Sequence, residues 1–387
     1  MLAGTSWYRR ATKFADAMIP FIDLHPVSQL VAGAVLPRWA SALSRCEFVG
    51  GAAVQDFERE LAGYCGTREA VTCGNGTDAL RLALQAAGVG PGTHVALPNL
   101  TFWATFEAIV QLGAIPILVD ISPDDLQLDL RELRRAHDAH RFRHAVLVHL
   151  YGWASAELSE IRTFCASREI CLVEDAAQAL GARVGGRPVL ADAAVASLSF
   201  YPAKVLGGCM DGGAVVTRDA ALSATVRSLA NHGRTAHYAH EQVGWNSRMS
   251  ALAAHYLREV LRHADEIVDA RRALGAHYRA RWAGAAPAAR LRGPAAGVRD
   301  NGYLVVLECA RPAEPYVAGF EQRGIAVRRT YPETLADQAG ARGRFVATGE
   351  LAQSRAFVQR VLNLPLYFGM AERDVDTVVD AARDLMR

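Results

Sequence analysis

The 387-residue chain is long enough for one large domain with a smaller second domain, and its 51% hydrophobic content supplies ample material for a core. The formal net charge is +2 and the basic residues are dispersed, which excludes the electrostatic signature of a nucleic-acid or membrane-surface protein. A membrane-spanning helix needs about 20 apolar residues, and no apolar run in the sequence approaches that length. Seven cysteines without a C-x-x-C pair indicate a reduced, cytoplasmic protein with neither a disulfide framework nor a metal site.

The start of the chain predicts an extension followed by the fold proper. Residues 1–18 carry two arginines and one lysine but no signal-peptide core, so we expect them to form an N-terminal extension. An entry segment then precedes a predicted helix over 51–64 and a strand over 70–73.

The glycine loop C-G-N-G-T-D opens the next predicted helix, which ends at Gly88. The free N–H groups and positive dipole end of such a helix attract phosphate, so Gly76 and Thr77 are candidate phosphate ligands. A plain N-cap by Asn75 or Thr77, with no ligand, is the alternative.

Strands and helices then alternate regularly along the chain. We predict them over 94–97, 116–120, 130–136, 145–150, 158–167, 170–173, 196–200, 214–216 and 220–230. This alternation indicates an α/β fold with a mostly parallel sheet covered by helices, in which ligands collect beyond the carboxyl ends of the strands. Phe102 follows one such strand and could stack on a ligand ring, although ordinary core packing is the alternative.

The strand over 170–173 continues into E-D-A-A-Q. A carboxylate at the end of an apolar strand needs a cation or hydrogen-bond donors. Because strand side chains alternate between faces, only one of Glu174 and Asp175 can point into a given site. Asp175 is the candidate partner of a protonated nitrogen in the ring of a bound ligand, and Gln178 could reach a hydroxyl group on the same ring. An acidic helix N-cap is the alternative for Asp175.

The stretch S-F-Y-P-A-K-V-L-G-G-C-M-D-G-G holds a lysine, Lys204, between aromatic residues and glycines. A lysine is usually a solvated surface charge, but a shielded amine in a tight turn can be a nucleophile. Such an amine suits Schiff-base chemistry with an aldehyde cofactor. Pyridoxal phosphate needs this lysine, a carboxylate at the ring nitrogen, a phosphate cradle and a stacking group, all of which have candidates here.

The remainder of the chain predicts a functional loop, a bridge and a second domain. The long polar loop over 231–249 is typical of segments that are either functional or disordered. The region up to residue 249 is the predicted large domain, 250–282 a connecting helix and 283–387 a small C-terminal α+β domain. Within the last, we expect a linker over 283–297, strands over 303–307 and 326–329, and helices over 316–322 and 374–386.

From about residue 19 to its end, the chain resembles the sugar aminotransferases of the DegT/DnrJ/EryC1/StrS family. The motifs that carry the resemblance are I-P-F-I-D-L, G-T-D-A-L, V-H-L-Y-G, V-E-D-A-A-Q, S-F-Y-P-A-K, D-G-G-A-V-V-T and N-S-R-M. These proteins are pyridoxal phosphate enzymes of the aspartate-aminotransferase fold (type I). The resemblance therefore implies that fold, with a small C-terminal α+β domain, and that cofactor.

The resemblance also implies a role for each matching residue. Lys204 would form the Schiff base and move the proton, and Asp175 would keep the ring nitrogen protonated. Further cofactor contacts would come from Gly76, Thr77 and Ser199 at the phosphate, Phe102 on the ring face and Gln178 at the ring hydroxyl. Asn246 would reach the phosphate of the neighbouring subunit, which implies a homodimer with shared active sites. Predicted substrate contacts are Tyr151, Arg248 and Tyr331.

The reaction so implied transfers an amino group from L-glutamate to a nucleotide-linked keto-sugar, with carbon 3 preferred over carbon 4. Three alternatives are a keto-cyclitol acceptor, a dehydratase of the same fold and a non-catalytic regulatory homologue. The sequence departs from the family pattern at Val205, at Met210 and in E-T-L-A after Tyr331 and Pro332. In the family the region after Tyr331 helps to hold the sugar, so that departure leaves the acceptor open, while Val205 and Met210 leave room for the non-catalytic alternative.

Overall fold

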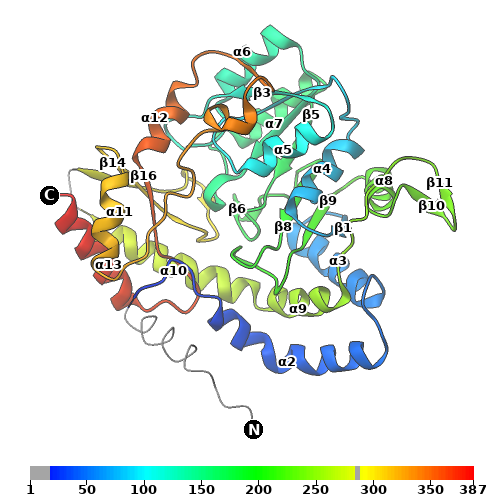
Figure 1. Ribbon diagram of the computed structural model, residues 1–387, viewed down its shortest axis with the longest axis horizontal. Coiled ribbons are helices and arrows are strands. Elements are labelled where there is room, and N and C mark those ends of the chain that lie inside the picture. Colours follow the sequence, from blue (N-terminus) through cyan, green and yellow to red (C-terminus); the bar gives the residue numbers. More distant parts are fainter. Residues whose placement is uncertain (1–17, 284–287) are drawn as a thin grey trace.

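An eight-stranded sheet forms the centre of the protein in the computed structural model, which describes residues 18–283 and 288–387 (Figure 1). Residues 1–17 of the predicted extension over 1–18, and residues 284–287 of the predicted linker, lie outside these ranges. In spatial order the strands are β1 (Glu69–Cys73), β9 (Gly213–Thr217), β8 (Val195–Ser199), β5 (Cys171–Asp175), β4 (His144–Val148), β2 (His94–Pro98), β3 (Ile115–Val119) and β15 (Val346–Ala347). Only β9 runs antiparallel to its neighbours, which confirms the mostly parallel sheet.

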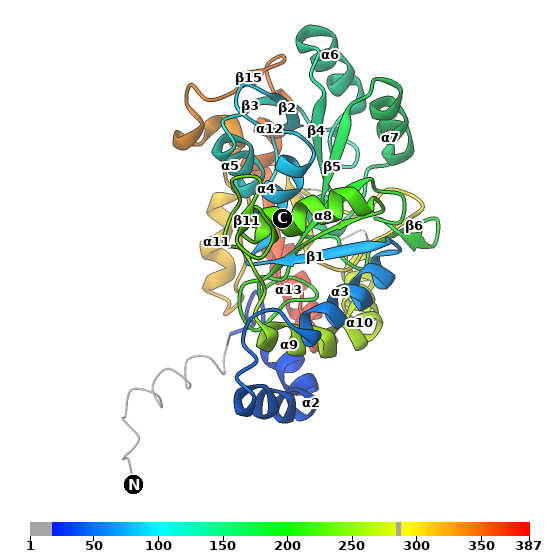
Figure 2. The same ribbon diagram turned by 90° about the vertical axis from the view of Figure 1, so that its right-hand side faces the viewer.

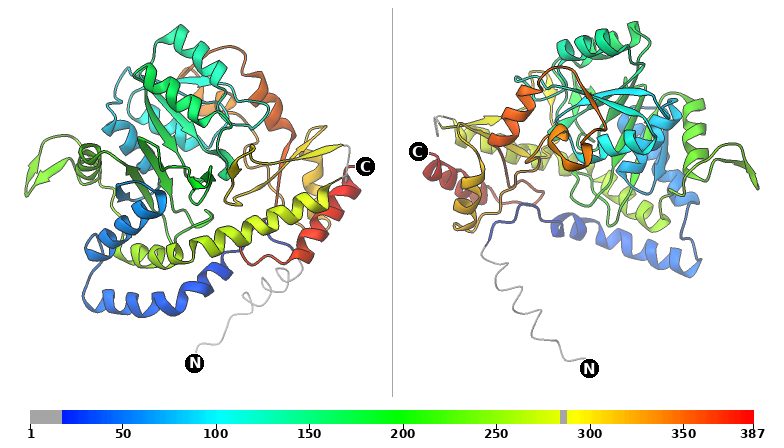
Figure 3. Two further views of the ribbon diagram at one scale, coloured as in Figure 1. Left: turned by 180° about the vertical axis from the view of Figure 1, so that it is seen from behind. Right: turned by 45° about the horizontal axis from the view of Figure 1, so that its top comes forward.

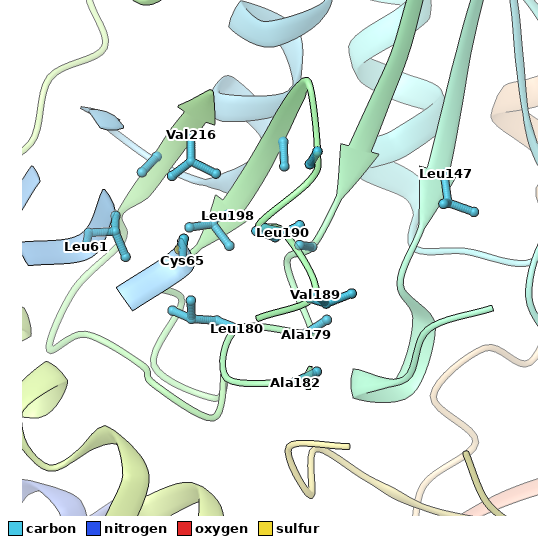
Figure 4. Packing of buried hydrophobic residues seen from close by; sticks show 14 of the residues in the cluster. Leu61, Cys65, Leu147, Ala179, Leu180, Ala182, Val189, Leu190, Leu198 and Val216 are labelled. Carbon is cyan, nitrogen blue, oxygen red and sulfur yellow. The ribbon is translucent and has the colours of Figure 1, made fainter. Parts of the chain in front are cut away.

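Two hydrophobic clusters cover the two faces of this sheet. Leu172 of β5 belongs to one cluster and its neighbour Val173 to the other, because strand side chains alternate between faces. Helices that pack into the first cluster are α3 (Ala52–Cys65), α6 (Leu130–His140) and α7 (Leu158–Ser167); those of the second are α4 (Gly76–Ala86), α5 (Trp103–Gln111) and α8 (Ala220–Ala230). Figure 4 shows the first cluster, where Leu61 and Cys65 of α3 meet Leu198 and Val216 of the sheet.

Three helices run along one side of the large sheet. They are α2 (His25–Ser44), α9 (Ala251–Arg262) and α10 (Ala264–Trp282) (Figure 3). Helix α2 was not predicted in the entry segment; it lies against α9, where the Trp39 indole donates a hydrogen bond to the Leu252 carbonyl at 2.9 Å. The connecting helix predicted over 250–282 is wrong in one respect, because non-helical backbone at His263 divides it in two.

The C-terminal part builds a second, antiparallel sheet with its own core. Its strands are β12 (Ala289–Arg292), β14 (Val305–Cys309) and β16 (Val361–Leu364), and its helices are α11 (Glu314–Glu321), α12 (Ala352–Arg360) and α13 (Glu372–Leu385). The predicted linker is wrong over 289–292, where β12 forms. The strand predicted over 326–329 is also wrong, since Arg328 makes only an isolated bridge to Asn363. Strand β15 leaves this part of the chain and joins the large sheet beside β3.

The remaining short elements connect or decorate these parts. They are β6 (Arg183–Val184), β7 (Arg187–Pro188), β10 (Arg234–Ala236), β11 (Ala239–His240), β13 (Val298–Arg299) and the 3-10 turns Leu150–Gly152, Leu335–Asp337 and Ala339–Ala341. The β10–β11 hairpin, which lies within the long loop over 231–249, projects sideways from the body in Figures 1 and 3 and points toward the viewer in Figure 2. Nowhere in the described ranges does a helix combine the length and apolar character needed to cross a bilayer.

Candidate active site

A cavity of about 630 Å3 opens at the carboxyl ends of β4, β5 and β8. Its walls bring together eight of the residues that the sequence singled out: Gly76, Thr77, Phe102, Asp175, Gln178, Ser199, Lys204 and Tyr331. This position agrees with the general placement of ligand sites in open α/β sheets.

One end of the cavity is formed by the start of α4. The Asn75 side chain caps the helix by accepting a hydrogen bond from the Asp78 N–H at 2.8 Å. Gly76 lies directly against the end of β8, so that an added Cβ would sit 2.6 Å from Ser199 Cβ. The first N–H groups of a helix lack intrahelical acceptors. The cap and a phosphate site are therefore compatible, with Gly76, Thr77 and Ser199 lining the same wall.

The carboxylate of Asp175 faces the cavity from the last position of β5. It accepts hydrogen bonds from the Thr105 hydroxyl at 3.0 Å and the Ala177 N–H at 3.1 Å. Only 8% of the residue is exposed, and this burial raises the pKa of Asp175 despite both bonds and the nearby charge of Lys204. A cation in the cavity, such as a protonated ring nitrogen, would stabilise this carboxylate.

The neighbouring Glu174 points to the opposite face of the sheet, as the strand alternation predicts. Arg162 holds it with two hydrogen bonds of 2.8 Å, and the ring of buried His149 lies 2.8 Å from its second oxygen. Burial acts to raise the pKa of Glu174, but these two partners together hold it below its ordinary value. Glu174 thus forms an ion pair with Arg162 outside the cavity and has a structural role.

Lys204 sits on a tight turn after β8, where its N–H donates to the Tyr201 carbonyl at 2.8 Å. The turn needs a glycine at 207, since a Cβ there would lie 2.3 Å from the Pro202 carbonyl oxygen. The Lys204 amine reaches the cavity, donates to the Tyr303 hydroxyl at 3.4 Å and lies 5.2 Å from the centre of that ring. The shielded lysine expected from the sequence is therefore partly enclosed by aromatic and glycine neighbours.

Gln178 joins two of the predicted substrate residues. Its amide nitrogen donates to the Tyr331 hydroxyl, and its oxygen accepts from the Tyr151 N–H at 2.7 Å. Tyr331 lines the cavity, whereas Tyr151 is fully buried behind Gln178 and is not part of the wall. The structure thus gives Tyr151 a supporting position instead of a place against a substrate.

Asn246 and Arg248 lie on an exposed loop outside this cavity. The Arg248 guanidinium donates to the Asn246 side-chain oxygen at 2.8 Å, and Arg248 lines a separate hollow beside the β10–β11 hairpin. Between them, the Ser247 hydroxyl donates to Asp78 of α4 at 2.6 Å and fixes the loop to the helix. Neither predicted residue lines the cavity in this structure.

Several residues that line or support the cavity were not predicted from the sequence. Tyr303, Thr330 and Arg81 line the cavity, and Thr105 holds Asp175 from α5. Thr105 lies in the first turn of α5, and its hydroxyl is 3.0 Å from that of Thr101, which precedes the helix. No local pattern marks Tyr303, which comes from the C-terminal part of the chain.

The donor set fits pyridoxal phosphate. Lys204 can engage the aldehyde, buried Asp175 can neutralise the ring nitrogen, and the start of α4 can hold the phosphate. Phe102, which is 59% exposed at the cavity wall, presents a ring for stacking. Fold and site together define a pyridoxal phosphate-dependent enzyme of the aspartate-aminotransferase fold.

The chain belongs to the DegT/DnrJ/EryC1/StrS aminotransferase family, whose sequence model matches residues 36–383. This confirms the family resemblance, the fold class and the assignment as an aminotransferase. The chain is 35% identical to the dTDP-3-amino-3,4,6-trideoxy-alpha-D-glucose transaminase of Streptomyces venezuelae, over 95% of this chain and 96% of that protein.

Two further comparisons agree. The chain is 36% identical to the UDP-2-acetamido-2-deoxy-3-oxo-D-glucuronate aminotransferase of Pseudomonas aeruginosa, over 67% of this chain and 72% of that protein. The solved structure of DesV from S. venezuelae in complex with a ketimine intermediate matches with a TM-score of 0.91 and 34% identity, covering 96% of this chain and 99% of that one.

Proposed function

We propose that the protein transfers the amino group of L-glutamate to carbon 3 of a nucleotide-linked keto-sugar. The observation that carries the proposal is the single cavity that holds Lys204, Asp175, Gln178 and the start of α4 together. The two relatives support a nucleotide-linked sugar, and both of their names place the amino or oxo group at carbon 3.

In this proposal the side chains divide the work among themselves. When bound, pyridoxal phosphate supplies an aldehyde and a ring that withdraws electrons from the reacting carbon. Lys204 would take the proton from the α-carbon of the amino donor at its Nζ atom and give it to the cofactor. In the second half-reaction it would take a proton back from the cofactor and deliver it to carbon 3 of the acceptor. Asp175 keeps a proton on the ring nitrogen by pairing with it, and Phe102 and Gln178 orient the ring.

A homodimer with shared sites completes the proposal. Asn246 and Arg248 lie on the same exposed loop outside the cavity of their own subunit, so they are free to serve a neighbouring one. Large apolar side chains are exposed near this loop and at the cavity mouth, including Val243 at 89% and Tyr201 at 55%. Burial of such side chains against a second copy would be favourable.

The seven free cysteines support a cytoplasmic location.

The visible absorbance spectrum with pyridoxal phosphate tests the core of the proposal. We expect the native protein to form a visible band that L-glutamate bleaches, and Lys204→Ala to bind the cofactor without that band. Protein from the bleached sample is then offered dTDP- and UDP-linked 3-keto-sugars and 4-keto-sugars, and the amino-sugar product is identified by mass spectrometry and NMR.

Each outcome has a distinct meaning. Return of the band with a 3-keto-sugar, together with a 3-amino product, supports the full proposal, while turnover of 4-keto-sugars alone overturns the choice of carbon. A band that L-glutamate leaves unchanged would favour a dehydratase or a different amino donor. Failure of the native protein to form any band refutes the enzymatic proposal.

A further inference from the structure

The segment Asn301–Tyr303, here named the 301–303 strap, ties the C-terminal part of the chain to the active site. The Asn301 side chain is fully buried and donates to the carbonyl oxygens of Gln178 at 2.7 Å and Leu180 at 2.9 Å. One end of the strap is therefore fixed to the chain that follows Asp175, next to Gln178 in the cavity wall.

A buried arginine of α10 fixes the other end of the strap. The Arg271 guanidinium, 7% exposed, donates to the carbonyl oxygens of Gly302 at 2.9 Å, Tyr303 at 3.0 Å and Leu366 at 2.9 Å. Burial of a cation is costly unless hydrogen bonds compensate it, so this arginine is a strong constraint on the backbone that it contacts. The left-handed backbone of Gly302, at φ +67°, allows the close approach, because a Cβ there would lie 2.8 Å from Arg271.

The strap holds the side chain of Tyr303 in one place. The ring packs against both of the hydrophobic clusters that cover the large sheet. Its hydroxyl faces the cavity and accepts a hydrogen bond from the Lys204 amine at 3.4 Å. A phenol with a fixed ring and a free end beside a reacting amine is suited to orient that amine.

We propose that Tyr303 is a further catalytic residue, whose hydroxyl orients the Lys204 amine whenever that amine is free, and that Arg271 and Asn301 are its positioning residues. The inference rests on the proposed function. Once the amino donor has displaced it, Lys204 takes one proton from the donor's α-carbon and becomes an ammonium group. One of its three N–H groups points to Tyr303 Oη, which leaves another to pass the proton on to the cofactor. Tyr303 keeps its own proton throughout.

The composition of the chain makes a direct test possible without any cofactor. Lys204 and Lys13 are the only two lysines among the 42 basic residues. Labelling with 13C and 15N lysine therefore gives two side-chain signals, and Lys13→Arg assigns them. In the cofactor-free protein we expect Tyr303→Phe to lower the order parameter of Lys204 Cε while the Lys13 signal stays unchanged. An unaltered Lys204 signal overturns the proposal, whether or not the protein is an aminotransferase.

A second readout uses the cofactor-loaded protein. Tyr303→Phe keeps the ring but removes the acceptor, so the single-turnover bleaching rate with L-glutamate should fall about 10- to 100-fold, the range for losing one hydrogen bond to a charged group. The deuterium isotope effect with α-deuterated glutamate should rise, because proton transfer becomes slower relative to the other steps. A change in rate without a change in isotope effect contradicts the proposed role.

Tyr278→Phe is the matched control. This tyrosine of α10 is fully buried and donates to the Pro365 carbonyl at 2.8 Å in the C-terminal core, away from Lys204. We expect it to lower the melting temperature without altering the Lys204 signal or the isotope effect. If Tyr303→Phe does not fold, Arg271→Gln decides, since it adds no third lysine: a more mobile Lys204 supports the proposal, and an unchanged Lys204 refutes it.

Discussion

Gly76→Ala tests whether the contact between α4 and β8 creates the phosphate end of the cavity. The added Cβ would lie 2.6 Å from Ser199 Cβ and 2.9 Å from its hydroxyl, so α4 must withdraw by about 0.8 Å to restore the 3.4 Å of an ordinary contact. Overpacking of this kind costs about 1–3 kcal/mol of folding stability. Because the helix start carries the phosphate-binding N–H groups, a displacement of this size should raise the Kd for pyridoxal phosphate about 10- to 100-fold.

Titration of the cofactor-free protein with pyridoxal phosphate, followed by absorbance, measures that Kd, and thermal unfolding measures the stability. Gly63→Ala is the control, since it lies in α3 with no atom within 4 Å of the added Cβ; it should stabilise the helix by about 0.5–1 kcal/mol and leave the Kd unchanged. Adding Ser199→Gly to Gly76→Ala removes the clashing atoms and should recover stability. A native Kd in Gly76→Ala would refute the reasoning.

Three other perturbations follow from buried charges and one anchored loop. Because the pKa of Asp175 is raised in the folded protein, ionisation of this carboxylate lowers the folding stability as pH rises through that pKa. Asp175→Asn should therefore raise the melting temperature of the cofactor-free protein at pH 7 while weakening cofactor binding. An equal or lower melting temperature contradicts this. Arg162→Met leaves Glu174 buried with one partner fewer and should cost about 3–5 kcal/mol at pH 7 in urea unfolding. Since the pKa of Glu174 is lowered, its stabilising contribution is lost as pH falls through the folded value, so the deficit must shrink in acid. Trp245→Ala removes the indole that donates to Gln85 at 2.7 Å, and hydrogen exchange over 231–249 should accelerate; unchanged exchange would show that the loop is held elsewhere.

Most elements between residues 51 and 230, though not α5, could be predicted because their signals are local. Glycine turns and apolar periodicity fixed α7 and α8 at the residues observed, and β5 extends only two residues beyond its predicted end. Helix α2 was missed because Pro37 interrupts its interior and proline argues against a helix. Strands β12 and β15 are too short for a periodic pattern, so only their pairing partners define them.

The residues of the candidate site likewise include some that the sequence could predict and some that it could not. Residues at strand ends, such as Asp175 and Lys204, could be selected from the sequence because parallel strands deliver their carboxyl ends to one edge. Tyr303 could not, since its approach to Lys204 depends on the strap and on a buried arginine far away in the chain. Tyr151 lies next to the correct strand end, yet a left-handed backbone, at φ 62°, accompanies its buried position. The catalytic and binding roles of these residues stay predictions until the variants are measured.

The parallel pairing of β15 with β3 has a consequence for the order of events during synthesis. Ile117 of β3 meets Val346, about 230 residues later in the chain. During synthesis on the ribosome, the hydrogen-bonding edge of β3 therefore stays unpaired until nearly the whole polypeptide has emerged. An unpaired edge strand readily recruits foreign strands. Termination shortly before residue 346 should consequently yield nascent chains that associate with one another, even though every residue of the proposed cofactor site would already have been translated.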